Sequence, residues 1–223
     1  MNKLLLILLL PCSLSVSAQN NVPPGDQRIM YDKLKSFTAT YEMKRGGQYW
    51  ATAVISMDSI MVDGKRAFRH SYEMQFDGQT VFDETIFLQE SMAPLLKFIH
   101  GGLGPDLAYK VYAYKDNRVV GSNNFADGRY VEPIDTTYEN SAYFGAGMAY
   151  LATALLKTDT GRSFQITSAL DDMIDTATWT LTSQEGGTML YTDAKGNKEF
   201  LIDKPPYLVK KEFPQFEVEW VLK

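Results

Sequence analysis

The sequence predicts a mainly β protein with one buried α-helix, in which a strongly curved antiparallel sheet or half-barrel packs around a single apolar helix near residues 141–156. Many segments of strand length are rich in Thr, Val, Ile, Tyr, Phe and Trp, which favour strands. Glycine-containing pairs such as Asp63-Gly64 and Gly186-Gly187 lie between these segments and suit hairpin turns. A single stretch has the apolar period of a helix instead.

The strand prediction rests on segments in which apolar and polar residues alternate. One face of residues 68–76 would carry the side chains of Phe68, His70, Tyr72, Met74 and Phe76. Two further segments repeat this pattern, the first with Phe37, Ala39, Tyr41 and Met43 and the second with Phe216, Val218, Trp220 and Leu222. A period of two with one apolar face is typical of an antiparallel sheet that is covered on one side.

The helix prediction rests on residues 141–156, which are rich in Ala, Leu and Met. The apolar residues recur at helical spacing, as Phe144, Met148, Leu151 and Leu155. Because almost no charge interrupts the segment, the helix is expected to be buried on more than one side. A sheet of about a dozen strands must curl, split or close. The apolar helix is therefore expected to fill the concave side of a curled sheet.

The N-terminal residues 1–18 have the pattern of a signal peptide. A basic start precedes the apolar run Leu4–Leu10, which is far shorter than the ~20 residues that span a bilayer, and small residues lead up to Ala18. Cleavage near Ala18 would place the protein in the periplasm or outside the cell. Cys12, the only cysteine, lies in this leader and offers an alternative, in which the chain is anchored by a lipid on Cys12.

The rest of the chain is expected to form a flexible lead-in over residues 19–30 and a single curved β-sheet domain over residues 31–223. The whole chain has a net charge of −5 and no basic stripe, which argues against a nucleic-acid partner. No segment after the leader approaches transmembrane length. Two histidines without further ligands at suitable spacing predict no metal site, and no motif predicts a cofactor or a catalytic residue.

The order of the segments carries a resemblance to a known family. A leader and a β-meander precede the segment ENSAYFGAGMAYLATALL, and further strands end in PPYLVKKEFPQFEVEW. This order over residues 37–223 resembles a family of uncharacterised secreted Gram-negative proteins, whose sheets are similar to the half-barrel of the periplasmic lipoprotein carriers. The resemblance implies a curved sheet around an apolar cleft, which the carriers use to shield acyl chains. Its motifs transfer no functional residue to this chain.

A ligand cleft between the sheet and the helix is the candidate site. The sheet would line it with Phe68, His70, Tyr72 and Met74, and the helix with Phe144, Met148 and Leu151. Each of these side chains could equally be plain core. His70 in particular is either a core histidine that is hydrogen-bonded to a neighbour or a polar group at the head of a ligand.

The expected function is that of a non-catalytic periplasmic or secreted protein that binds an apolar or amphipathic, lipid-like ligand. Its partner would be a lipid or another apolar small molecule. Two alternatives stay open. The first is an envelope scaffold or interaction module that presents tyrosines and edge strands to an envelope protein. The second is a hydrolase that uses a pair of carboxylates, which the many acidic residues would permit.

Overall fold

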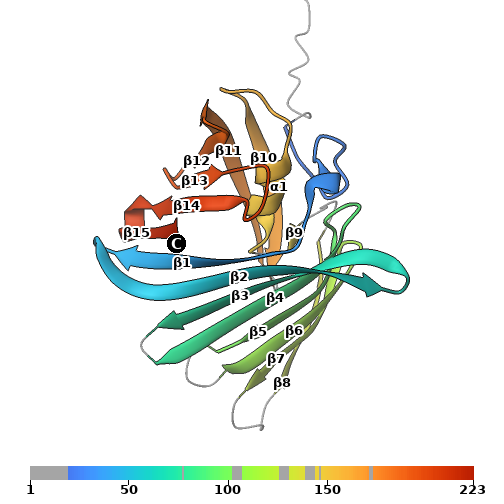
Figure 1. Cartoon of the computed structure of the whole chain (residues 1–223). Coiled ribbons are helices and arrows are strands. Elements are labelled where there is room, and N and C mark those ends of the chain that lie inside the picture. Colours follow the sequence, from blue (N-terminus) through green and yellow to red (C-terminus); the bar gives the residue numbers. More distant parts are fainter. Residues whose placement is uncertain are drawn as a thin grey trace, which may run out of the picture.

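The chain forms one 15-stranded, mostly antiparallel sheet with one short α-helix (Figure 1). This computed structural model describes residues 20–76, 78–101, 107–125, 131–138, 144–145, 147–170 and 173–223. The predicted signal peptide, with Cys12, lies outside the described residues. The mainly β, antiparallel architecture that the alternating segments predicted is confirmed.

The first eight strands of the sheet lie in the N-terminal part of the chain. They are β1 (Phe37–Arg45), β2 (Gln48–Val62), β3 (Lys65–Phe76), β4 (Gln79–Leu88), β5 (Pro94–His100), β6 (Leu107–Lys115), β7 (Arg118–Phe125) and β8 (Val131–Thr137). The remaining elements are β9 (Phe144–Gly145), α1 (Ala149–Leu155), β10 (Ser163–Leu170), β11 (Met173–Glu185), β12 (Thr188–Asp193), β13 (Lys198–Leu201), β14 (Leu208–Phe213) and β15 (Val218–Leu222). Two 3-10 turns are η1 (Tyr31–Lys33) and η2 (Pro214–Phe216).

The strands pair in the order β8-β7-β6-β5-β4-β3-β2-β1-β15-β14-β13-β12-β11-β10-β9. Most neighbouring strands are therefore consecutive in the chain and form hairpins. The pairing of β1 with β15 joins the first strand of the chain to the last. The turn between β2 and β3 uses Asp63 and Gly64, both at positive φ, as the sequence predicted. Glycine tolerates this backbone region without steric cost.

The sheet remains open, and it is neither closed nor strongly curled, which corrects the half-barrel prediction. Closure would require hydrogen bonds between the two edge strands, β8 and β9. However, β9 has only two residues, and it pairs in parallel with Ser168 and Ala169 of β10. Register shifts, such as the one between Met43 and Lys44, interrupt regular pairing at several points along the sheet.

Helix α1 lies against the sheet but is shorter than the predicted helix over residues 141–156. It spans seven residues, of which Tyr150 to Leu155 are buried, and it contacts β10, β13 and β14. Two features prevent an earlier start. Phe144 is extended in β9, and Gly147 has a φ of 89°, which is incompatible with a helix. Burial of the helix is thus confirmed, whereas its length was overestimated.

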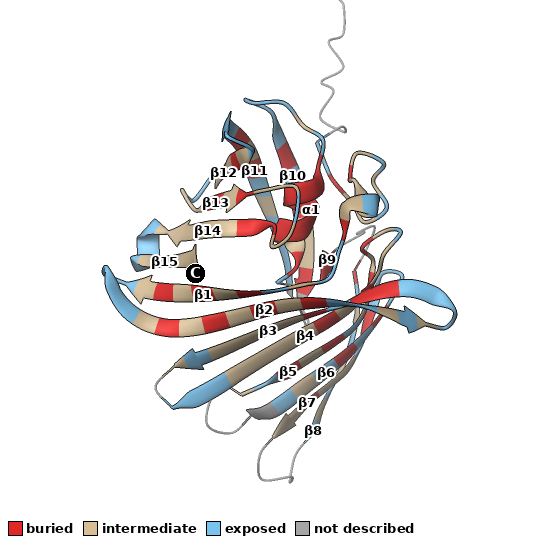
Figure 2. Cartoon of the chain, in the orientation of Figure 1, coloured by how far each residue is buried: buried red, intermediate tan, exposed pale blue. Residues whose placement is uncertain are grey.

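The main core lies between α1 and the inward-facing positions of both halves of the sheet. Figure 2 shows buried residues concentrated beside α1, with exposed residues at the strand ends. Residues 20–30 also reach this core, because Val22 and Ile29 are buried. The Val22 N–H donates to the Gln165 carbonyl at 2.8 Å, and the Met30 N–H donates to the Leu155 carbonyl at 3.0 Å. The segment expected to be a flexible lead-in thus makes specific contacts with β10 and α1.

Close packing at Gly145 provides a test of how β9 sits in the core. A Cβ atom at this position would lie 2.7 Å from Thr85 Cγ2 and 3.3 Å from Met148 Sδ. We expect Gly145→Ala to lower the free energy of unfolding by about 1–3 kcal/mol, the usual cost of overpacking. Urea denaturation measures this change.

The Thr85→Ser substitution supplies the matched control, since it removes the methyl group that the new Cβ would meet. The double variant should recover part of the lost stability, because the two sites are in contact. Purely additive effects of the two substitutions would contradict the described packing.

Candidate functional site

A cavity of about 330 Å³ lies between α1 and the sheet, and we call it the inner cavity. Strands β2, β3, β4, β14 and β15 contribute to its wall, together with α1 and the turn before it. Its lining residues are Ile55, His70, Tyr72, Asp83, Gly147, Tyr150, Leu208, Lys211 and Trp220. The cavity therefore combines apolar side chains with a small number of polar groups, as ligand sites commonly do.

A more open cavity of about 410 Å³, the outer cavity, adjoins the inner one. It is lined by Met43, Arg45, Trp50, Tyr72, Met74, Phe213, Phe216, Val218 and Trp220. Tyr72 and Trp220 belong to both cavities, and their rings stack at a centroid distance of 5.4 Å with an angle of 8°. We call the two cavities together the cleft.

Small side chains on β2 explain how two aromatic rings from β3 and β15 can meet. Ala53 pairs with Met74 on β3, and Ala51 pairs with Met43 on β1. Both alanines are fully buried and leave space above β1 and β2. Tyr72 reaches across that space, because its hydroxyl lies 3.9 Å from Met43 Sδ. The stack with Trp220 thus covers the alanine floor of the sheet.

His70 lies at the inner end of the cleft as an uncharged group. It is 4% exposed, and its Nε2 lies 3.0 Å from the Tyr150 hydroxyl. Burial, aided by the positive charge of Lys97, lowers the pKa of His70 to about 3. Burial also raises the pKa of Tyr150 well above its ordinary value. Both partners are therefore neutral near pH 7, and they form a hydrogen bond that can orient a polar atom.

Charged groups on the inner cavity come in compensated pairs. The Lys97 ammonium donates to both carboxylate oxygens of Asp83, at 2.7 and 2.9 Å, and its side chain is fully buried. Burial raises the pKa of Asp83, while the charge of Lys97 opposes that rise. Lys211 pairs in the same way with the buried carboxylate of Glu199. Pairing offsets the cost of placing these charges in a low dielectric.

Trp220 adds a hydrogen-bond donor that the protein itself does not use. Its indole Nε1 is buried and has no hydrogen-bond partner among the described residues. Most buried polar groups are satisfied, so an unsatisfied one calls for an explanation. Trp220 lines both cavities, whereas its Nε1 is closed off from solvent and is not an exposed donor in the cleft.

The structure divides the seven predicted lining residues into two groups. His70, Tyr72 and Met74 line the cleft. The other four are buried in the core and line neither cavity, namely Phe68, Phe144, Met148 and Leu151. Phe144 and Met148 lie before α1 rather than on it, because the helix is shorter than predicted.

Sequence reasoning missed several cleft residues, including Trp220, Lys211 and Asp83. The alternating pattern did place Trp220 on the apolar face of its strand. That pattern does not reveal that β15 pairs with β1, which brings Trp220 close to Tyr72. No signal in the sequence marked Asp83 or Lys211.

The titratable side chains that line the cleft are Arg45, His70, Tyr72, Asp83, Tyr150 and Lys211. In the part of the chain that the structure describes, no three His, Cys, Asp or Glu residues are grouped so as to hold a metal ion. Asp83 is the one carboxylate among the described residues that line the cleft. No helix in the described ranges is long and apolar enough to cross a membrane.

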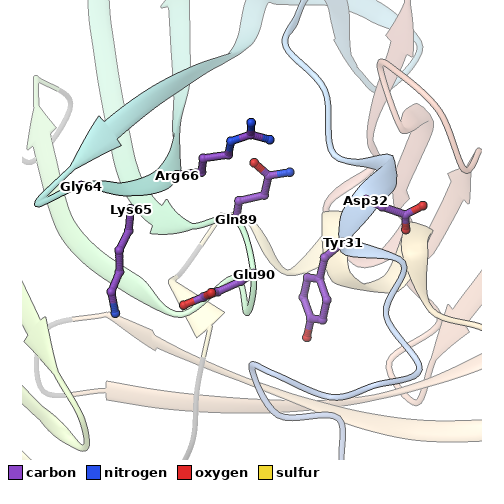
Figure 3. A pocket seen from close by; sticks show the side chains of 7 residues that line it. All are labelled: Tyr31, Asp32, Gly64, Lys65, Arg66, Gln89 and Glu90. Carbon is purple, nitrogen blue, oxygen red and sulfur yellow. The ribbon is translucent and has the colours of Figure 1, made fainter.

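A third hollow, of about 400 Å³, lies beside η1 and the turn between β2 and β3 (Figure 3). It is lined by Tyr31, Asp32, Gly64, Lys65, Arg66, Gln89 and Glu90. The labelled side chains point in different directions, with Asp32 and Lys65 directed away from each other. With charges of both signs and no point of convergence, this hollow is a weaker candidate than the cleft.

Comparison of the chain with protein-family models, with curated proteins and with solved structures finds no match. The resemblance to the family similar to the lipoprotein carriers therefore stays a prediction from the sequence.

Burial of neutral His70 predicts a loss of stability in acid. The unfolded chain takes up a proton on this residue near pH 6.5, whereas the folded chain resists protonation until about pH 3. Since the unfolded state binds more protons in this window, stability falls as the pH falls from 6.5 towards 3. We expect His70 to lower the free energy of unfolding by about 3 kcal/mol at pH 4 relative to pH 7.

Urea denaturation of His70→Gln at the two pH values measures this contribution, because glutamine keeps a hydrogen-bonding group but does not titrate. Comparison with wild type separates His70 from Asp83, whose raised pKa acts in the opposite direction. An equal acid sensitivity in His70→Gln and wild type would contradict the prediction.

Proposed function

We propose that the protein binds an apolar or amphipathic ligand in the cleft and acts as a non-catalytic binding or carrier protein of the cell envelope. The observation that carries this proposal is the pair of adjoining cavities, of about 330 and 410 Å³, that meet at the Tyr72–Trp220 stack. Small-molecule sites typically measure roughly 300–1,000 Å³.

The side chains of the outer cavity suit an apolar chain or ring. Met43 and Met74 are flexible and polarizable, so they can adapt to a ligand of irregular shape. Trp50, Phe213 and Phe216 supply flat apolar surface around them. Burial of apolar ligand surface contributes about 25 cal/mol per Å², from which the costs of ordering are subtracted.

The inner cavity suits a neutral polar group of the same ligand. The hydrogen-bonded pair of His70 and Tyr150 is uncharged, and the charges of Asp83 and Lys211 are compensated. A ligand with a polar atom along an otherwise apolar body satisfies these groups.

The resemblance in the sequence also supports this proposal, because it implies an apolar cleft of the kind in which the periplasmic lipoprotein carriers shield acyl chains. Export by the predicted signal peptide would bring the protein to the envelope, where lipids are abundant. The open sheet of this chain would then serve the role that a half-barrel serves in the carriers.

Native mass spectrometry with organic extraction tests the proposal directly. The protein purified from an envelope fraction should carry an apolar or amphipathic molecule, and Met74→Trp should lose it because the larger side chain fills the outer cavity. We expect at least a tenfold weaker affinity in the variant, which corresponds to about 1.4 kcal/mol of binding free energy and appears as a lower occupancy.

Gln75→Trp is the matched control, because Gln75 is the next residue of β3 and its side chain points to the opposite face. This variant should retain the ligand. Circular dichroism checks that wild type and both variants are folded. The proposal would be contradicted if wild type showed an apo mass that does not change after incubation with envelope lipids.

A second candidate function, protein interaction, is supported by an apolar outer face on β5, β6 and β7. Leu96 is 43% exposed and Val120 is 41% exposed, and both pair with Ala113 across β6. Val111, on the same face of β6, is 39% exposed. Nearby, the ring of Phe98 lies within 6.1 Å of the ring of Tyr109. Contiguous apolar surface of this kind often marks an interaction site.

Photocrosslinking in the producing cell tests this second candidate. A benzophenone side chain in place of Val111 should form one discrete adduct with an envelope protein if the outer face docks a partner. The same group in place of the exposed residue Gln75 should form none. Identical, diffuse labelling from both positions would argue against a specific partner on this face.

A further inference from the structure

We infer that the ligand of the cleft is an amphiphile with an anionic group, which binds to Arg45 at the open end of the outer cavity. This inference rests on the proposed function, because it names the chemical class of the ligand and its orientation in the cleft.

Arg45 is the cation of the outer cavity. It is the last residue of β1, it is exposed, and it lines the cavity together with Met43, Trp50 and Phe216. Arg45 forms no ion pair with any residue in the described ranges. Glu217 lies beside the neighbouring Gly46 but forms no ion pair with Arg45. The guanidinium is therefore available to an external anion.

The balance of charge along the cleft singles out Arg45. Asp83 and Lys211 line the inner cavity, and each is neutralised by a buried partner, Lys97 and Glu199 respectively. Arg45 is thus the charged side chain of the cleft that forms no ion pair with a described residue, and it places a positive charge at the outer cavity. The whole chain has a net charge of −5, so this local excess of positive charge is opposite to that of the protein. An anion is the ligand group that such a site attracts.

The arrangement of apolar and charged groups also sets the orientation of the ligand. Arg45 is exposed and lines the outer cavity beside apolar side chains, and the Tyr72–Trp220 stack lies where the two cavities meet. A carboxylate or a phosphate can accept two parallel hydrogen bonds from a guanidinium. The apolar body would then extend over Met43 and Met74 towards the stack.

Isothermal titration calorimetry with four probes of equal chain length tests this inference. The probes are dodecanoate, dodecyl phosphate, dodecyl maltoside and dodecyltrimethylammonium, each below its critical micelle concentration. We expect wild type to bind an anionic probe at least tenfold more tightly than the cationic probe. Comparison of dodecanoate with dodecyl phosphate distinguishes a carboxylate head from a phosphate head. Added salt should weaken only the binding of the anionic probes.

Arg45→Gln should weaken binding of the anionic probes by about threefold to tenfold and leave the binding of dodecyl maltoside unchanged. Arg66→Gln is the matched control, since it makes the same change in net charge on the exposed surface outside the cleft. It should leave all affinities unchanged. Arg45→Lys should retain part of the preference, because it keeps the charge but loses the paired hydrogen bonds.

The outcomes separate the two proposals. Equal binding of all four probes, or an equal effect of Arg45→Gln on neutral and anionic probes, overturns the anionic class but leaves the cleft as the binding site. Tighter binding of the cationic probe overturns the anionic class as well. If none of the four probes binds, both the anionic class and the proposed function are overturned. The same holds if a probe binds but Met74→Trp does not reduce its binding.

Discussion

The limited reach of helix α1 is the constraint on which the rest of the structure depends. An open sheet of this width has an inner face that must be covered, and the chain provides one α-helix of seven residues among those described. A helix of that length is only about 10 Å long. It covers the part of the face beside β10, β13 and β14, and residues 20–30 extend this cover. The cleft lies where this cover ends, and Tyr150 of α1 forms part of the wall of its inner cavity.

The sheet adapts to this partial cover through the size of its side chains. Where α1 packs, large residues such as Tyr41 and Phe164 fill the core. Over β2 the inward positions become Ala51 and Ala53, and the stack of Tyr72 on Trp220 forms a roof over them. The aromatic pair therefore protects the floor of the sheet and at the same time joins the inner and outer cavities. Structure and proposed binding site follow from the same arrangement.

Electrostatics divide the cleft into a neutral inner end and a positive outer end. In the interior, charges are tolerated only in pairs, such as Lys97 with Asp83, and His70 is held uncharged. Arg45 stays exposed to solvent and pays no such desolvation cost. A polar but neutral interior with a cation at its opening is consistent with a ligand that buries its apolar body and keeps its charge at the surface.

By itself, the sequence determined the class of the fold, because alternation and turn chemistry act locally: strands such as β1 and β3 and the turn at Asp63-Gly64 were predictable. It also identified Tyr72 and Met74 as inward-facing residues. Only the tertiary structure decided which strands are neighbours, since the pairing of β1 with β15 joins residues as far apart in the chain as Tyr41 and Leu222. That pairing places Trp220 beside Tyr72 and brings Arg45 to the opening. The length of α1 also depends on tertiary contacts, because Phe144 pairs with β10 although the sequence pattern around it favours a helix.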